Sequence, residues 1–216
     1  MRVSTGIQGL DYILRGGLLS GRVYLVHGEP GTGKTTLGLH FVSSGEGGLL
    51  ITFAQSADHL RADAASLGLN LDNVRILDLT PPPETFVEMQ AYDIFSPAEV
   101  EREPISLQIS KTIQETQPRR IYVDGFGYFR TLASDSFHYR RLAQSFFRFA
   151  TLRDATLIVG AHDRECARDV GGVILLESSA EGRTISVTKF RGSDYHAGPQ
   201  PMRLTGAGLQ VPLSAA

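Results

Sequence analysis

In the first two thirds of the chain, apolar residues form short continuous runs, and segments with apolar residues three or four positions apart lie between them. The runs predict strands at residues 23–27, 48–54, 74–77, 120–124 and 155–160. They are rich in β-branched and large apolar residues and lack the polar alternation of a half-exposed strand. The intervening segments predict helices at residues 35–41, 56–67, 105–116 and 137–152. This alternation favours a parallel sheet covered on both faces.

Local signals support several of these helices. Gly68 stops the helix that begins at Ser56, and Pro118 ends the one that begins at Ile105. The last helix carries phenylalanines at a spacing typical of a buried face, namely Phe146, Phe147 and Phe149. Residues 80–104, with three consecutive prolines at 81–83, are interpreted as an irregular surface excursion.

The last third of the chain has a different pattern, with short apolar runs separated by turn residues. These runs predict strands paired as hairpins at residues 172–177, 183–190, 201–204 and 208–211. The predicted fold class is α/β, a mostly parallel sheet flanked by helices with antiparallel strands at its C-terminal edge. A chain of 216 residues with 42% apolar residues can bury one core, so we expect a single domain over 1–216.

Charge and composition narrow the classes of partner. The formal net charge is -2, which gives no overall basic field, so nucleic acid is not an expected partner. Residues 1–7 lack the layout of a secretory signal, and no apolar stretch is long enough to span a bilayer. We therefore expect a cytoplasmic protein without a membrane partner. The lone cysteine, Cys166, fits no metal or nucleophile spacing and is interpreted as a structural or exposed thiol.

The glycine-rich segment 28–35 carries the clearest chemistry. It satisfies G-x-x-x-x-G-K-[ST] and lies between a predicted strand and a predicted helix, as a phosphate-binding loop must. Its glycines allow backbone N–H groups to point at phosphate oxygens, and the following helix presents its positive end. We predict that the loop binds ATP through Gly28, Glu29, Pro30, Gly31, Thr32, Gly33, Lys34, Thr35 and Thr36.

A magnesium ion is expected with the nucleotide. The hydroxyl of Thr35 is the predicted ligand on the loop, and Lys34 would reach the β- and γ-phosphates. Asp124 ends its own apolar strand and is the predicted carboxylate for the metal, bound directly or through water.

Several segments together resemble the KaiC-type ATPases of the RecA superfamily, the circadian-clock ATPases and their single-domain relatives. The resemblance spans nearly the whole chain and is carried by residues 5–11, Gly16, Gly17, Gly21, 28–35, 51–53, the strand ending at Asp124, and 184–193. It implies a RecA-like phosphate-loop NTPase fold over 1–216 and a homo-oligomeric ring, a hexamer, with ATP at the subunit interfaces. A regulatory protein partner is also compatible with it.

The segment 189–193 resembles the family's Lys-x-Arg-Gly signature. The resemblance implies that Lys189 and Arg191 project toward the γ-phosphate held by the neighbouring subunit, as arginine fingers supplied in trans do. A solvated basic pair on an edge strand is the alternative.

The chain departs from the family pattern after the strand 48–54. The resemblance leads us to expect Phe-Glu-Glu there, with a glutamate that activates the attacking water, but this chain has Phe53, Ala54 and Gln55. Glutamine can orient a water but cannot act as a base, and loss of a general base costs about a hundredfold to ten-thousandfold in rate. We therefore predict an ATPase that binds nucleotide tightly and hydrolyses it slowly, with Lys34, Gln55, Asp124, Lys189 and Arg191 as catalytic residues.

Weaker candidates surround this site. His162 and Asp163 follow the strand 155–160 and are candidates for sensing the γ-phosphate, while Ser134 and Ser136 are candidates for phosphorylation.

Three other functions stay open at this stage. A nucleotide-gated scaffold would bind ATP without meaningful turnover. A DNA recombination ATPase is disfavoured by the slightly acidic charge and the short link 162–171. A small-molecule kinase would need an acceptor pocket, for which residues 80–104 could form a lid.

Overall fold

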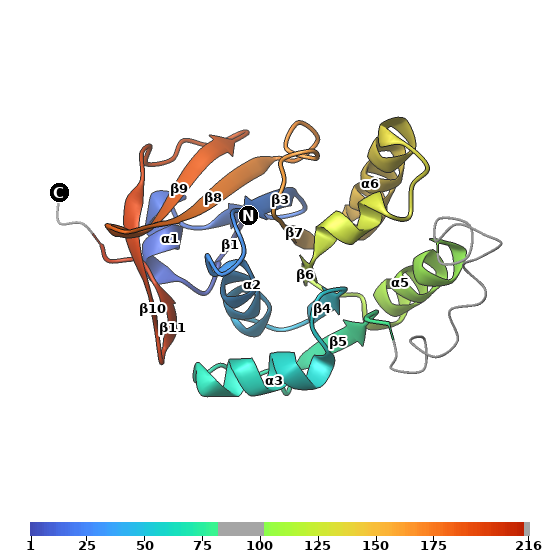
Figure 1. The fold of residues 1–216 in the computed structure, drawn as a ribbon, viewed down its shortest axis with the longest axis horizontal. Coiled ribbons are helices and arrows are strands. Elements are labelled where there is room, and N and C mark those ends of the chain that lie inside the picture. The colour runs from blue at the N-terminus through green and yellow to red at the C-terminus, as the bar shows by residue number, and fades with distance from the viewer. Residues whose placement is uncertain (82–101, 214–216) are drawn as a thin grey trace.

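A computed structural model describes residues 1–81 and 102–213 of the chain. Its main feature is a 9-stranded sheet with the order β11-β10-β9-β8-β3-β7-β6-β4-β5 (Figure 1). The strands of this sheet are β3 (Val23–His27), β4 (Gly48–Thr52), β5 (Val74–Asp78), β6 (Arg120–Asp124), β7 (Thr156–Ala161), β8 (Gly172–Ser179), β9 (Gly182–Phe190), β10 (Gln200–Thr205) and β11 (Gly208–Gln210). A separate antiparallel pair joins β1 (Arg2–Val3) to β2 (Leu18–Leu19).

The predicted helices lie between the strands in the predicted order, as α2 (Lys34–Ser43), α3 (Ala57–Ser66), α5 (Arg102–Thr116) and α6 (Ser136–Thr151). The structure adds α1 (Gln8–Ile13) and a short 3-10 helix, η3 (Phe126–Arg130). The side chain of Ser56 caps α3 by accepting the backbone N–H of His59, as its position before the apolar pattern indicates.

The direction of the strands confirms the predicted α/β class. β3 pairs in parallel with both β7 and β8, and β4 pairs in parallel with β5 and β6. From β8 onward each strand pairs antiparallel with the next, so β9, β10 and β11 form the antiparallel edge. The carboxyl ends of β3, β4, β6 and β7 therefore meet at one edge of the sheet.

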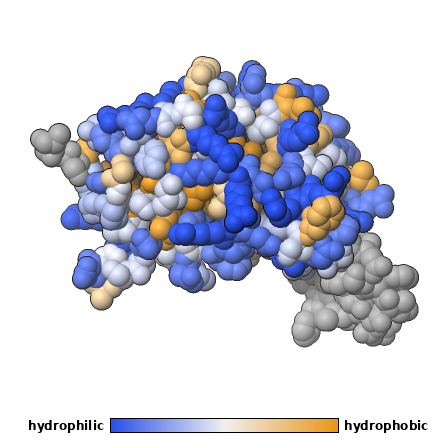
Figure 2. Space-filling model, turned by 90° about the horizontal axis from the view of Figure 1, so that it is seen from above, coloured by the Kyte–Doolittle hydropathy of each residue, from blue (hydrophilic) through white to orange (hydrophobic). Residues whose placement is uncertain are grey.

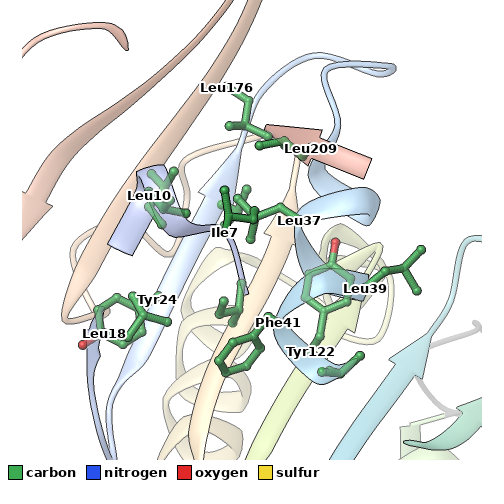
Figure 3. Close-up of a cluster of buried hydrophobic side chains, with 14 of the residues drawn as sticks. Ile7, Leu10, Leu18, Tyr24, Leu37, Leu39, Phe41, Tyr122, Leu176 and Leu209 are labelled. Carbon is green, nitrogen blue, oxygen red and sulfur yellow. The ribbon is translucent and has the colours of Figure 1, made fainter. Parts of the chain in front are cut away.

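Helices cover both faces of the sheet (Figure 1), and an apolar layer lies against each face. Side chains alternate along β3, so that Tyr24 and Val26 pack with α1, α2 and α3, while Val23 and Leu25 pack with α5 and α6. Figure 3 shows part of the first layer, in which Leu37 and Phe41 of α2 lie among side chains of β2, β3 and β11. Strands buried on both faces explain the continuous apolar runs.

One predicted helix boundary was wrong. α5 begins at Arg102 instead of Ile105, because Pro104 lies in its first turn, where a missing N–H removes no helical hydrogen bond. The predicted excursion 80–104 is thereby shortened, and residues 82–101 of it lie outside the described residues. The phenylalanine prediction is confirmed, since Phe146 and Phe147 are buried and Phe149 packs against the same core.

Polar and apolar residues are interspersed on the surface. Figure 2 shows one face, on which hydrophilic residues predominate and hydrophobic patches lie between them. No helix within residues 1–81 and 102–213 combines the length and apolar character that crossing a bilayer requires.

Candidate functional site

The loop between β3 and α2 has the backbone shape that its glycines predict. Gly31 and Gly33 have φ angles of 79° and 107°, in the left-handed region that favours glycine. A Cβ at Gly28 would lie 2.2 Å from the carbonyl oxygen of Leu176, so this position also requires glycine. Gly33 is the N-cap of α2, and the positive end of that helix faces the loop.

The side chain of Lys34 reaches back across the phosphate loop. Lys34 Nζ donates hydrogen bonds to the carbonyl oxygens of Gly28 at 2.7 Å and Glu29 at 2.9 Å. The Thr32 hydroxyl donates to the same Glu29 carbonyl at 2.8 Å and fixes the turn. Burial lowers the pKa of Lys34, whereas the charges of Asp124 and Glu29 act in the opposite direction. The ammonium group can therefore exchange carbonyl oxygens for phosphate oxygens without leaving the loop.

The loop threonine meets the strand-end aspartate. The Thr35 hydroxyl donates to Asp124 Oδ1 at 2.9 Å, and the Tyr122 hydroxyl donates to the same oxygen at 3.0 Å. Asp124 is only 5% exposed. Burial raises the pKa of its carboxyl group, and the hydrogen bonds from Thr35 and Tyr122 and the charge of Lys34 oppose that shift. The sequence predicted this pairing of Thr35 with Asp124 for a magnesium site.

The donor set fits magnesium. A hydroxyl and a carboxylate are the hard oxygen ligands that Mg²⁺ takes, and in nucleotide sites it completes its shell with phosphate oxygens and water. Within the described residues no group of three or more His, Cys, Asp and Glu side chains could hold a metal ion. Such an ion at Thr35 and Asp124 would therefore depend on the nucleotide for further ligands.

The turn after β4 lies beside the end of β6. The backbone N–H of Phe53 donates to the carbonyl oxygen of Asp124 at 3.1 Å, and a Cβ at Gly125 would lie 3.1 Å from the Ala54 Cβ. The Thr52 hydroxyl donates to the Gln55 carbonyl at 2.8 Å. The turn that holds Ala54 and Gln55 therefore lies beside the backbone of Asp124 and Gly125, and neither of its two residues supplies a carboxylate.

A buried histidine lies directly before the loop. His27 ends β3, is 3% exposed, and its Nε2 has no hydrogen-bond partner in the part of the chain that the structure describes. Burial, together with the charges of Arg164 and Lys34, lowers the pKa of His27 to about 4, although Asp163 acts the other way. The ring is therefore neutral near pH 7.

The weaker candidates are His162, Asp163, Ser134 and Ser136. His162 is exposed, and Asp163 Oδ1 accepts the backbone N–H of Glu165 at 2.9 Å. The Ser134 hydroxyl lies 3.0 Å from Nδ1 of His138 at the start of α6, where Ser136 is the first helical residue. These contacts neither join them to the loop nor test a role in sensing or phosphorylation.

Cys166 is structural. It is buried, and burial raises the pKa of its thiol to about 12, so the thiol stays protonated near neutral pH. The sequence-based interpretation is confirmed.

Lys189 in β9 and Arg191, the residue that follows β9, lie away from the phosphate loop of their own chain. Lys189 Nζ donates to the Ala167 carbonyl at 2.7 Å, and Arg191 Nη2 donates to the Arg168 carbonyl at 3.3 Å. The Arg191 carbonyl in turn accepts Arg22 Nη1 at 2.6 Å, which places it beside the amino end of β3. The phosphate loop follows the opposite, carboxyl end of β3. Within one subunit the structure therefore does not bring Lys189 or Arg191 to Lys34.

The sequence reasoning did not single out Tyr122, which contacts the candidate site. Tyr122 lies two positions before Asp124 in β6, and the period of a strand puts both side chains on the same face. This spacing of two positions is the sequence signal that could have identified Tyr122 as a neighbour of Asp124. The glycines that make room for the ring, Gly38 and Gly160, carry no pattern that connects them to it.

The strand directions, the loop between β3 and α2, and the pairing of Thr35 with Asp124 define a RecA-like phosphate-loop protein. The chain belongs to the KaiC ATPase family, since the family described as "ATPase: KaiC" matches residues 3–215.

Curated relatives agree with this assignment. The "Circadian clock oscillator protein KaiC" of Prochlorococcus marinus (strain MIT 9313) is 28% identical and aligns with 99% of this chain and 46% of its own length. The protein of the same name from Synechococcus elongatus is 28% identical, with 99% and 45% covered. The "Circadian clock protein KaiC2" of Synechocystis sp. is 28% identical, with 98% and 40% covered. The chain thus spans less than half the length of these three relatives.

Proposed function

We propose that this chain is a magnesium-dependent ATPase of low turnover that assembles into a homo-oligomeric ring, and that its nucleotide state controls assembly or the binding of a partner. The observation that carries the proposal is the hydrogen bond between the Thr35 hydroxyl and Asp124 beside the phosphate loop. The side chain of Lys34 lies across the same loop and donates to the carbonyl oxygen of Gly28. The KaiC family and the clock proteins among the relatives support a clock-like or signalling role.

The residues of the loop would bind the triphosphate. Backbone N–H groups around Gly31 and Gly33, whose φ angles are positive, and at the start of α2 would donate to the phosphate oxygens, as they do in such loops. Lys34 would move from the carbonyls of Gly28 and Glu29 to the β- and γ-phosphates.

Thr35 and Asp124 would hold the metal. The Thr35 hydroxyl can donate its proton to Asp124 Oδ1, as it does in the structure, and offer a lone pair to a cation. Magnesium, when bound, neutralises charge on the β- and γ-phosphate oxygens as the transferred group separates.

Water activation is the weak step of the proposed mechanism. Gln55 can hydrogen-bond and orient a water molecule, but it cannot take its proton, and Ala54 can do neither. Low turnover would then depend on positioning and on charge neutralisation, which supply most of the catalysis in phosphoryl transfer.

The neighbouring subunit would complete the site. Lys189 in β9 and Arg191 directly after it contact carbonyl oxygens of residues 167 and 168 in their own chain, and β8 separates β9 from β3, which precedes the loop. In a ring they would be free to reach the γ-phosphate of an adjacent subunit, where cations of this kind stabilise the transition state. A hexamer is the ring size that we propose.

A scaffold without meaningful turnover is the second candidate, because the position expected to carry a carboxylate base holds Ala54 and Gln55. ATP bound between subunits would then stabilise the ring by mass action alone. The two candidates make different predictions for turnover.

Analytical ultracentrifugation with ATP, with ADP and without nucleotide, combined with steady-state phosphate release, tests both. The proposed ATPase gives a larger ATP-dependent assembly and slow phosphate release that disappears in Lys34→Ala. A scaffold gives the assembly without release. A monomer whose mass is the same in all three conditions contradicts both.

A further inference from the structure

A tyrosine hydroxyl is buried beside the candidate magnesium carboxylate. Tyr122 and Asp124 lie on the same face of β6, toward α2. The Tyr122 hydroxyl donates to Asp124 Oδ1 at 3.0 Å, and the Thr35 hydroxyl of α2 donates to the same atom at 2.9 Å. Two hydroxyl donors from two elements therefore converge on one carboxylate oxygen.

Gly38 of α2 and Gly160 of β7 leave a closely fitting space for the Tyr122 ring, which we call the tyrosine seat. A Cβ at Gly38 of α2 would lie 2.1 Å from Cε1 of the ring, and a Cβ at Gly160 of β7 would lie 2.4 Å from its hydroxyl oxygen. Tyr122 is 0% exposed, and Figure 3 shows its ring beside α2. The ring occupies space that any larger residue at either glycine would take, so the hydroxyl has little freedom to turn away.

The carboxylate needs such support. A carboxylate side chain turns readily about its last torsion, since the wells of χ2 in aspartate are broad. Burial of Asp124 also makes each hydrogen bond to it more important, because a buried charge without partners is costly. Among the described residues both hydroxyl donors act on Oδ1, which leaves Oδ2 as the oxygen without a protein donor.

We propose that Tyr122 is a positioning residue for magnesium binding. Its hydroxyl holds Asp124 in the orientation in which Oδ1 receives the proton of Thr35 and Oδ2 stays available to the metal or to its bound water. Tyr122 itself touches neither the metal nor the nucleotide. The inference rests on the proposed function, because it assumes that Thr35 and Asp124 hold magnesium with ATP.

Tyr122→Phe is the decisive variant, since phenylalanine keeps the ring and removes only the hydroxyl. The measurement is the dissociation constant of a fluorescent ATP analogue in excess magnesium and in EDTA, and the ratio of the two values is the magnesium coupling. We expect the coupling to fall on the order of tenfold, as for the loss of one hydrogen bond to a charged group, with affinity in EDTA unchanged. A purely structural role would change both constants together.

Tyr24→Phe is the matched control. Its hydroxyl accepts the Leu19 N–H at 2.8 Å and donates to the Leu19 carbonyl at 3.0 Å, and it is buried on the same face of the sheet. Its loss should leave the magnesium coupling at the wild-type value. Circular dichroism melts of both variants verify that they are folded.

The outcomes separate this inference from the proposed function. A wild-type protein that binds no ATP analogue, or binds it equally with and without magnesium, contradicts the proposed function and the inference with it. Wild-type coupling that is retained in Tyr122→Phe contradicts only the positioning role. An equal loss in both phenylalanine variants also contradicts it, because the effect would then follow from losing any buried hydroxyl of this layer.

Discussion

The hydroxyl of Thr35 donates a 2.9 Å hydrogen bond to Oδ1 of Asp124, a residue 89 positions further along the chain. Thr35 is in the first turn of α2, and Asp124 is the last residue of β6. The parallel order of β3, β7 and β6 brings the ends of these segments to one edge of the sheet. This contact joins the phosphate loop to the proposed metal carboxylate.

Restoring a carboxylate after β4 should accelerate hydrolysis. Gln55→Glu places a general base in the turn beside Asp124, and a general base contributes about a hundredfold or more to rate. We expect phosphate release by the assembled protein to rise at least about tenfold, with ATP affinity little changed. Gln114→Glu, at an exposed position of α5, serves as the control for a Gln-to-Glu exchange. An unchanged rate in Gln55→Glu would show that residue 55 does not face the attacking water.

Mixing two inactive variants should restore activity if the site is shared between subunits. Lys34→Ala disables the loop, and Arg191→Ala disables the cation that we propose to act in the neighbour. In an equal random mixture, half of the loops are intact and half of those face an intact Arg191, so about a quarter of wild-type phosphate release should return. Each variant alone should show almost none. A mixture as inactive as its components contradicts the action in trans.

A buried histidine should make stability depend on pH. His40 Nε2 accepts the backbone N–H of Leu209 at 2.9 Å, which fastens β11 to α2. Burial lowers the pKa of His40 from its ordinary value of 6.5, so the unfolded chain binds more protons in this range. This contribution to stability is complete above about pH 6.5 and is lost as pH falls toward the lower folded pKa.

His40→Gln removes that titration. Urea unfolding of the wild type should show a free energy of unfolding that decreases below about pH 6.5, by at most about 1.4 kcal/mol per pH unit for this one group. His27, whose folded pKa is about 4, adds a slope of the same sign, so the variant should have a shallower slope and not a flat one. Equal slopes in wild type and His40→Gln contradict the assignment.

A methyl group on α2 should disturb the tyrosine seat. Gly38→Ala would place a Cβ 2.1 Å from the Tyr122 ring, so the ring or the helix must shift. We expect the free energy of unfolding to fall by about 1–3 kcal/mol, the usual cost of overpacking. Gly206→Ala is the matched control, since no atom lies within 4 Å of its added Cβ. If thermal denaturation shows equal stability for Gly38→Ala and wild type, the seat is looser than the structure indicates.

The elements with a strong local pattern could be predicted from sequence. The bounds of β3 and β6 agree with the predicted strands because these runs are buried on both faces and end at a glycine loop and at a carboxylate. Thr35 and Asp124 could be paired in advance, since each is the expected residue at the end of its own element. The start of α5 could not be placed, because a proline in a first turn resembles a helix breaker when only the sequence is read.

Other parts of the site depend on contacts between distant residues. The hydrogen bond of Tyr122 to Asp124 requires that Gly38 and Gly160 leave space on two neighbouring elements, and no local pattern contains that information. Similarly, the sequence placed Lys189 on a predicted strand and Arg191 just after it, but did not show that they contact residues 167 and 168 of the same chain. Their proposed action on a neighbouring subunit stays a prediction.

Titration calorimetry of ATP with magnesium into wild-type protein and Lys34→Ala is the most direct test of the central claim, that the loop after β3 binds the triphosphate. Lys111→Ala is the matched control, because Lys111 is exposed and, among the residues that the structure describes, its ion pair is with Glu115 on α5. The account predicts saturable binding to wild type and Lys111→Ala, with affinity at least about a hundredfold weaker in Lys34→Ala, since a charged group bound to phosphate is lost. Absence of binding to folded wild-type protein, or equal binding by Lys34→Ala, would contradict it.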